Sequence, residues 1–465
     1  MQKIVIKGFG PIMNAEIELK KTVVLIGEQA TGKSTIAKLI YYFKSLREDL
    51  FNKIYNESFN QDFEFDYTKY LIFPLREKFY DFFGSTFHMR NFEIIFFYDV
   101  DKDKYLTLTL NAEKKLDSHF SDSFRVRDLS VQIAGIRKFM PDKINENNIS
   151  DVLAFNQEKL KYAEKLSNIL KDLFCCKQDD NLFIVAGRNA TVGYSESFEK
   201  QFLVDAHKQR DESFKKKQQT IDETLMFDFI ERVVDMKGLF KKFGNFEDFL
   251  KTFNLPKQEK EKMRTILTKI ENILKGKYKI DNYGEHIVFN SKTQERVDLS
   301  NSSSGQQEII RILQDIFLTI AQNKNVLRIV EEPEVHLFPI AQKKVVELLV
   351  QMANNNDNNQ LIITTHSPYV LTVLNNLLFA QRVIDKNNNA EEEVSKIIDK
   401  ESRMKSDNFS AYVLTNDNDN VFSKTIIDET TGMIGQNYLD TVSEILGYEF
   451  NSLYSIYTKK PKDND

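Results

Sequence analysis

The chain has 465 residues, of which 41% are hydrophobic and 29% charged, and these proportions are typical of a folded globular protein. Its net charge of -5 excludes a global basic field, so any contact with nucleic acid must come from a local patch. Two adjacent cysteines, Cys175 and Cys176, argue against a disulfide framework and predict a reducing, cytoplasmic location. The N-terminus lacks a secretory core and no stretch of about 18 apolar residues is present, so we expect no membrane span.

The N-terminal thirty residues predict three short strands. Residues 4–6 and 15–19 are separated by a glycine and proline turn at residues 8–11, and the second of them alternates strictly between apolar and polar side chains. Residues 23–26 are continuously apolar, which is typical of a strand buried on both faces.

A glycine-rich loop follows the third strand and opens a helix. Gly27 and Gly32 allow backbone N–H groups to surround phosphate oxygens, while Lys33 supplies a positive charge for the β- and γ-phosphates. The Ser34 hydroxyl can ligate Mg²⁺, and the helix directs the positive end of its dipole at the anion. We therefore predict a phosphate loop, in preference to a glycine turn with a surface lysine. Its residues are Gly27, Glu28, Gln29, Ala30, Thr31, Gly32, Lys33, Ser34 and Thr35.

A long insertion separates this helix from the remaining motifs. Residues 92–98 and 105–110 predict a β-hairpin, residues 151–174 a helix, and residues 182–186 a buried strand. Residues from about 196 to 275 are charged and predicted to be helical. The basic run at residues 215–217 has two interpretations, a solvated helix face, which we favour, and a DNA contact.

The last third alternates strands and helices, after a predicted hairpin at residues 278–299. A strand at residues 326–330 ends in Glu331 and Glu332. Adjacent acids on an extended backbone point to opposite sides, so one can face a metal and the other a γ-phosphate. Solvated acids at a strand end explain this pair equally well when it is considered alone. The strand at residues 361–363 is followed by His366, and a lone histidine in such a place is usually a packed or surface residue.

Small hydroxyl residues and Gly305 precede a strongly amphipathic helix. Such a segment can bind an anion at the helix N-terminus. The favoured local explanation is an ordinary N-cap, with Glu308 completing a capping box.

The order of these four motifs resembles that of ATP-binding-cassette ATPases. The chain is similar to their soluble branch, which is SMC-like and overcoming-lysogenisation-defect-like. The shared blocks are Ile-Lys-Gly-Phe-Gly-Pro-Ile at residues 6–12, Glu-Glu-Pro-Glu-Val-His-Leu-Phe-Pro at 331–339 and Thr-His-Ser-Pro at 365–368. The resemblance covers residues 1–55 and 280–380. It implies an α/β P-loop NTPase fold of the ABC-ATPase type, a mixed sheet flanked by helices, with a mainly helical insertion.

The resemblance also implies hydrolysis of ATP with Mg²⁺ in a composite site. Glu331 and Ser34 would hold the metal, Glu332 would be the base for the attacking water, and His366 and Lys33 would contact the reacting phosphate. The residues expected to close the site of a second copy are Ser303, Gly305 and Gln306. ATP would then join two copies head to tail. Ser302 and Ser304 stand where the family commonly has Leu and Gly, and the glutamine loop is not located.

Arg188 has two interpretations, a strand-end ion pair, which we favour, and a group near the nucleotide. The acids at residues 417 and 419 are better explained by a hairpin turn than by a Toprim nuclease centre. The chain is expected to comprise an N-terminal half of the ATPase core at 1–55, a hairpin and helical part ending in a core strand at 56–195, a helical lobe at 196–277, a C-terminal half of the core at 278–385, and an extension at 386–465.

The leading functional hypothesis is a cytoplasmic ATPase that dimerises around nucleotide and gates a separate nuclease or toxin. Such a protein would be similar to ATPase components of bacterial anti-phage systems such as Septu or PARIS. The alternative is an SMC-like ATPase that binds DNA in repair or chromosome maintenance. A third possibility is that ATP serves as a structural switch with negligible turnover. The long separation of Gly305 from Lys33 disfavours a membrane transporter.

Overall fold

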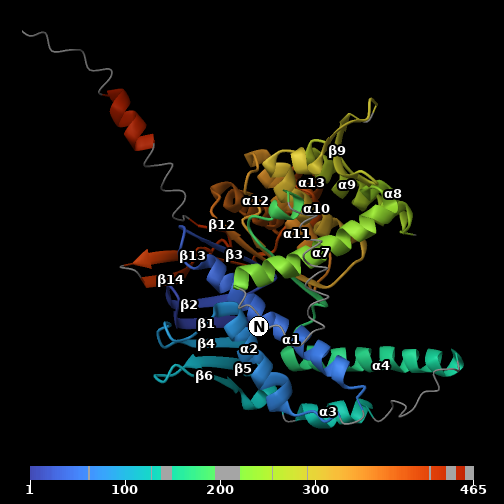
Figure 1. Ribbon diagram of the computed structural model, residues 1–465. Helices are drawn as coiled ribbons and strands as arrows, with labels where there is room; N and C mark the ends of the chain where they lie inside the picture. Colours follow the sequence, from blue (N-terminus) through green and yellow to red (C-terminus); the bar gives the residue numbers. More distant parts are fainter. Residues whose placement is uncertain are drawn as a thin grey trace, which may run out of the picture.

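A mixed eleven-stranded sheet organises the protein (Figure 1). The computed structural model describes residues 1–60, 63–126, 128–137, 149–193, 220–253, 255–290, 292–417, 420–435 and 447–455. The strand order is β6-β5-β4-β1-β2-β14-β13-β3-β12-β11-β7. Helices flank this sheet (Figure 1), so the predicted α/β class is confirmed.

The antiparallel part of the sheet is a meander joined to the N-terminal strands. Its strands are β1 (Gln2–Phe9), β2 (Ile12–Leu19), β4 (Glu93–Asp99), β5 (Lys104–Leu110) and β6 (Leu116–Phe120). Side chains such as Ile4 and Ile6 are buried and alternate with exposed or half-exposed neighbours, as expected for a sheet with one face on the core. The predicted hairpin is confirmed as β4 and β5, and β6 extends it by one strand.

The parallel part of the sheet is buried and carries the predicted motifs at its carboxyl ends. Its strands are β7 (Asp180–Ile184), β13 (Phe409–Asp417), β3 (Thr22–Gly27), β12 (Gln360–Thr365) and β11 (Val326–Glu331). Every residue of β3, β11 and β12 is buried. Ile26 pairs with Thr365, and Glu331 pairs with Thr364. The phosphate loop, the acidic pair and His366 therefore leave the same edge of the sheet.

The strand β13 comes from the region predicted to be an extension. It pairs in parallel with β3 and antiparallel with β14 (Asn420–Thr425), which in turn pairs with β2. The predicted hairpin is confirmed by the pairing of Asp417 with Asn420. Its place in the middle of the sheet was not predicted, because the pairing of distant strands leaves no local sequence signal.

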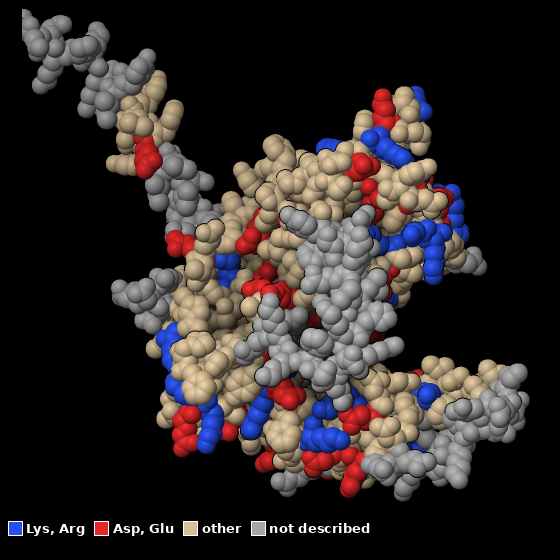
Figure 2. Space-filling model, viewed as in Figure 1, with Lys and Arg blue, Asp and Glu red and all other residues tan. Residues whose placement is uncertain are grey.

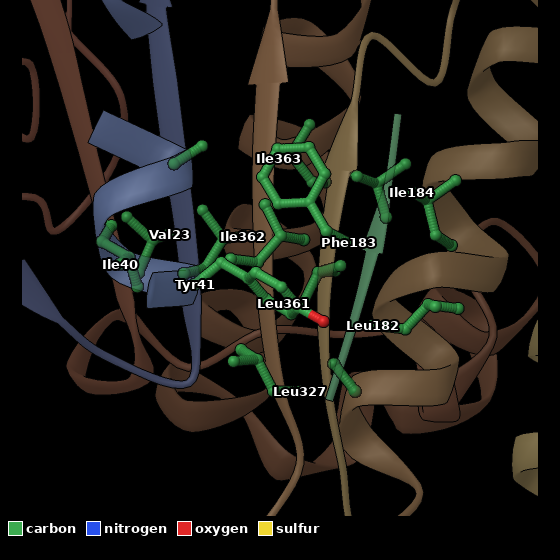
Figure 3. Packing of buried hydrophobic residues seen from close by; sticks show 14 of the residues in the cluster. Val23, Ile40, Tyr41, Leu182, Phe183, Ile184, Leu327, Leu361, Ile362 and Ile363 are labelled. Atoms are coloured by element: carbon green, nitrogen blue, oxygen red, sulfur yellow. The ribbon is translucent and has the colours of Figure 1, made fainter. Parts of the chain in front are cut away.

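One long helix covers the parallel strands. This helix, α1 (Lys33–Glu57), packs against β3, β12, β11 and β7. Tyr41 enters the core beside Phe183, with the two rings 5.7 Å apart, and Ile40 lies near Val23 (Figure 3). Neighbouring helices in the same region are α2 (Phe73–Phe83), α3 (Asp128–Arg137) and α4 (Ile149–Phe174).

A second group of helices surrounds the motif-bearing C-terminal region. Its members are α7 (Ile221–Phe243), α8 (Phe246–Lys251), α9 (Lys257–Leu274), α10 (Ser304–Ala321), α11 (Pro339–Asn354) and α12 (Pro368–Lys386). The predicted hairpin at 278–299 is a three-stranded sheet of β8 (Lys277–Asp281), β9 (Gly284–Asn290) and β10 (Glu295–Asp298). The basic run at residues 215–217 lies outside the described residues.

The remaining elements are short. They are α5 (Ala190–Gly193), α13 (Glu391–Ser395), a helical stretch at residues 447–455, and 3₁₀ or π segments at Thr68–Ile72, Asp122–Phe124, Leu299–Asn301, Asn388–Ala390, Lys400–Ser402 and Ser406–Asn408. None of the described helices combines the length and apolar character needed to cross a bilayer.

Candidate functional site

The phosphate loop contains residues in the left-handed conformation, which suits the binding of an anion by backbone N–H groups. Ala30 and Gly32 have φ angles of 61° and 82°, and such left-handed residues form concave nests of N–H groups. The Thr31 hydroxyl donates to the Glu28 carbonyl at 2.8 Å and closes the turn. Gly27 has no room for a side chain, because a Cβ atom there would lie 2.6 Å from the Leu414 carbonyl oxygen.

Lys33 lies in this loop with its side chain buried. Its ammonium donates to the carbonyl oxygens of Gly27 at 2.9 Å and Glu28 at 2.6 Å. Burial lowers the pKa of Lys33 to about 8, although the negative charges of Glu332 and Glu334 favour the ammonium. The positive charge is therefore held at the loop by weak carbonyl acceptors, for which phosphate oxygens are stronger replacements.

Most of the other predicted loop residues are accessible to solvent. Glu28, Gln29, Ala30 and Ser34 are exposed, and Thr35 is half-buried in the first turn of α1. The N-terminus of this 25-residue helix places partial positive charge at the same point. The loop therefore has the open, electropositive form that a polyphosphate requires.

Glu331 and Glu332 leave the end of β11 in different environments. Glu331 is buried, and its Oε2 accepts from the Ala186 N–H at 3.3 Å. Its Oε1 is also buried and has no hydrogen-bond partner within the described part of the chain. An unsatisfied buried carboxylate oxygen is costly, and a hard cation such as Mg²⁺ suits it. The residues present therefore fit a magnesium ion.

Glu332 is half-exposed and stands next to His366. The Glu332 backbone adopts a φ of 43°, a strained conformation that clusters at functional sites. Its Oε1 lies 3.0 Å from the His366 Nε2. Its charge also acts on Lys33. The structure thus brings together three residues that the sequence placed on three separate strand ends.

Ser303, Gly305 and Gln306 form the N-terminus of α10. The Ser303 Oγ accepts from the Gln306 N–H at 3.3 Å, and the Gln306 Oε1 accepts from the Ser303 N–H at 3.1 Å. The capping box is therefore completed by Gln306, and its predicted completion by Glu308 is wrong. Because Ser303 is the N-cap, the third helical position is residue 306.

Gln306 and Gly305 also contact neighbouring segments of the same chain. The Gln306 Nε2 donates to the Leu274 carbonyl at 2.6 Å, and a Cβ atom on Gly305 would lie 2.7 Å from the His336 carbonyl oxygen. Among the described contacts, none joins Ser303 or Gln306 to Lys33. Their assignment to the site of a second copy stays a prediction.

Arg188 is fully buried at the end of β7 and touches both acids through their backbone. Its guanidinium donates to the carbonyl oxygens of Val185 at 3.0 Å, Glu331 at 2.9 Å and Glu332 at 3.0 Å. It also pairs with the Glu308 carboxylate at 3.4 Å. The favoured interpretation, a strand-end ion pair, is confirmed. Arg188 ties the turn after β11 to the first turns of α10.

Comparison with known proteins places most of the chain in one family. Residues 1–371 match the family described as AAA ATPase domain. The chain belongs to this AAA ATPase domain family. A search of curated proteins found no match.

Two solved structures show a weak likeness to the ATPase. An SMC head bound to the C-winged helix domain of ScpA has 10% identity and a TM-score of 0.40, covering 92% of this chain and 98% of that chain. The SMC head domain from Thermotoga maritima has 10% identity and a TM-score of 0.36, covering 91% and 98%.

The ATPase contains a buried ionic network that the sequence did not reveal. Arg328, in the middle of β11, pairs with Asp315 of α10 at 2.6 Å and with Asp180 of β7 at 3.0 Å. Arg232 of α7 contacts the same two carboxylates at 3.0 and 3.2 Å. Burial opposes ionisation of Asp180, but Arg328 and Arg232 outweigh it and lower its pKa to about 2. The only sequence signal was an arginine within an apolar strand.

A further acid of the ATPase, Glu334, was not assigned a role from the sequence. It lies two residues beyond Glu332, and its Oε1 accepts from the Thr365 hydroxyl at 2.6 Å and from the His366 N–H at 2.9 Å. The signal available was its place in the 331–339 block. That block does not show which strand end its side chain reaches.

Proposed function

We propose that this ATPase domain protein binds ATP and hydrolyses it at the carboxyl ends of β3, β11 and β12. The observation that carries the proposal is the convergence of Lys33, Glu332 and His366, with the Glu332 carboxylate 3.0 Å from the His366 imidazole. A positive group for the phosphates and a solvent-accessible carboxylate for the attacking water are the two elements that phosphoryl transfer to water requires.

Each residue has a distinct part in the proposed reaction. Lys33 binds the β- and γ-phosphates, and Glu332 accepts a proton from the attacking water. His366 fixes the orientation of Glu332 and donates to the γ-phosphate. The orphan oxygen of Glu331 and the Ser34 hydroxyl would hold Mg²⁺, and the bound ion would supply positive charge to the phosphate oxygens.

We further propose that two copies complete the site head to tail. Ser303 is exposed at the N-terminus of α10, an 18-residue helix, where the helix dipole favours an anion. Gly305 and Gln306 lie in the same turn. In this arrangement the α10 terminus of one copy faces the γ-phosphate held by Lys33 of the other.

The test measures phosphate release, nucleotide affinity and molar mass in solution. Lys33→Ala should abolish ATP binding. Glu332→Gln should bind ATP with wild-type affinity, lose kcat by about 100-fold or more, and elute as a dimer with ATP. Ser303→Arg should prevent that dimer while leaving the monomer able to bind ATP. Phosphate release by Glu332→Gln at the wild-type rate would contradict the proposed base, and undetectable release by the wild type would favour a structural nucleotide.

We propose gating of a separate nuclease or toxin in the cytoplasm as the biological output, in the manner of anti-phage ATPase components. The Arg328 network supports this, because it joins the motif-bearing strand β11 to the helical lobe through Arg232. Such a network offers a contiguous set of contacts between β11 and α7. The Glu332→Gln dimer should then co-purify with a partner from the native host.

The alternative function, an SMC-like DNA-binding ATPase, makes a different prediction. It requires binding to duplex DNA that depends on ATP and weakens steeply with salt. Acidic and basic side chains are interspersed over the described residues on the face shown in Figure 2. Tight, salt-sensitive DNA binding by the Glu332→Gln dimer without a protein partner would therefore favour the alternative over effector gating.

A further inference from the structure

Glu334 joins two segments of the proposed active site that are far apart in the chain. It lies in the turn between β11 and α11, whereas the two groups that donate to its Oε1, the Thr365 hydroxyl and the His366 N–H, lie at the end of β12. The distances of 2.6 and 2.9 Å are those of strong, charge-assisted hydrogen bonds. One carboxylate oxygen therefore fixes the backbone from which the His366 imidazole projects.

The polar contacts continue beyond Glu334. The Thr365 Oγ1 accepts from the Ser367 N–H at 3.0 Å, and the Ser367 hydroxyl donates to the Gln342 Oε1 at 2.7 Å. The backbone on both sides of His366 is thus held, while the imidazole reaches the Glu332 carboxylate at 3.0 Å. A ring of contacts runs from Glu332 through the turn to Glu334, and back through His366.

The second oxygen of Glu334 supports a functional role. Oε2 is buried and has no hydrogen-bond partner in the part of the chain that the structure describes. A carboxylate retained only to stabilise a turn would be expected to satisfy both oxygens.

We propose that Glu334 is a positioning residue, which holds His366 against Glu332 through the backbone of the β12 end. The proposal rests on the proposed ATPase function and adds a residue to it. In this role, Glu334 contacts neither the nucleotide nor the attacking water. It acts on turnover through the imidazole that it orients, and so its loss should lower kcat with little effect on KM.

Two substitutions separate positioning from charge. Glu334→Gln keeps a carbonyl oxygen as acceptor for Thr365 and His366 but removes the negative charge. Glu334→Ala removes both. The matched control is Glu93→Ala, which deletes a half-exposed carboxylate paired with Lys7 at 2.7 Å on the antiparallel strands.

The first readout needs neither nucleotide nor metal. Hydrogen exchange of a peptide covering residues 361–369 should be unchanged in Glu334→Gln and Glu93→Ala. In Glu334→Ala, exchange at the His366 amide should be at least about tenfold faster, because its acceptor is gone. This exchange measurement does not depend on ATP hydrolysis. It therefore distinguishes a failure of this inference from a failure of the proposed function.

The second readout is steady-state ATP hydrolysis. Glu334→Ala should lose kcat by about 10- to 100-fold with KM within about threefold, and Glu334→Gln should retain most of kcat. Equal losses in both variants with unchanged exchange would assign the effect to charge and overturn the proposal, as would wild-type kcat in Glu334→Ala. If Glu334→Ala does not fold, Thr365→Val removes one of the two donors to Glu334, and wild-type kcat in that variant would likewise overturn the proposal.

Discussion

Lys33 is the residue at which burial and charge act most directly on nucleotide binding. Its free-state pKa of about 8 means that the ammonium is present below pH 8 and is lost above it. Bound phosphates raise this pKa, so binding above pH 8 must take up a proton. We expect the Kd for ATP to be constant below pH 8 and to rise by up to about tenfold per pH unit above it.

The measurement is a titration with a fluorescent ATP analogue between pH 7 and 9.5. Lys33→Arg is the matched variant, because arginine stays charged over this range. Its Kd should be weaker but independent of pH. The same pH dependence in both proteins would assign the titration to another group.

Arg188 illustrates a residue whose importance is structural. Arg188→Met would leave the Glu308 carboxylate without its ion-pair partner and the carbonyls of Glu331 and Glu332 without their donor. We expect a loss of about 3–5 kcal/mol in the free energy of unfolding, as for other broken buried pairs, measured by urea denaturation. The double variant Arg188→Met with Glu308→Leu should lose less than the sum of the single variants. Additive losses would contradict a direct pair.

The predictability of single residues from the sequence depends on how local their role is. The phosphate loop is defined by spacing within nine residues, and its conformation follows from two glycines and a helix start. Glu334 and Arg188 depend on which strand ends meet, and no local pattern records that. Glu308 was assigned to the helix cap because the position of the N-cap could not be read to within two residues.

At the scale of elements, the three-stranded sheet is fastened to α10 by one buried pair. Glu285 of β9 contacts Arg311 of α10 at 2.5 and 2.8 Å and accepts from the Tyr278 hydroxyl at 2.8 Å. Burial opposes ionisation of Glu285, but Arg311 outweighs it and lowers its pKa from 4.5 to about 2. The stabilisation is therefore complete above pH 4.5 and is lost as the pH falls toward 2.

This pair predicts how a substitution of Glu285 changes stability at neutral and at acidic pH. Glu285→Gln should reduce the free energy of unfolding by about 3 kcal/mol at pH 7. Between pH 4.5 and 2, the wild type should lose more stability than the variant, which has no carboxylate to protonate. Denaturant unfolding followed by circular dichroism measures both. If the free energy of unfolding fell equally with pH in both proteins, the assignment of this titration to Glu285 would be contradicted.

Elements with strong apolar patterns were predicted well, and those with weak patterns were not. The hairpin expected at 92–98 and 105–110 is observed at Glu93–Asp99 and Lys104–Leu110. The strands β6 and β10, with the sequences Leu-Asp-Ser-His-Phe and Glu-Arg-Val-Asp, are short and polar. They form strands because a neighbouring strand supplies the backbone hydrogen bonds. Tertiary contacts thus override their low intrinsic β propensity.

At the scale of the whole molecule, the C-terminal hairpin is part of the central sheet. A chain ending at residue 400 would lack β13 and β14, leaving edges of β3 and β2 unpaired. We expect it to be aggregated or unfolded. A chain ending at residue 435 keeps both strands and should unfold within a few degrees of the full chain. Calorimetry and gel filtration compare the two. A folded, ATP-binding chain ending at residue 400 would contradict this prediction.

The position of β13 has a consequence for synthesis of the protein. The strand that leads into the phosphate loop lies between β12 and β13, both made long after it, and Gly27 packs against the Leu414 carbonyl. Domains generally fold as units while the ribosome elongates the chain, but this one cannot complete its centre until residues 409–417 emerge. The nascent strand β3 must wait for both of its neighbours for most of translation, so the nucleotide site is among the last parts of the protein to form.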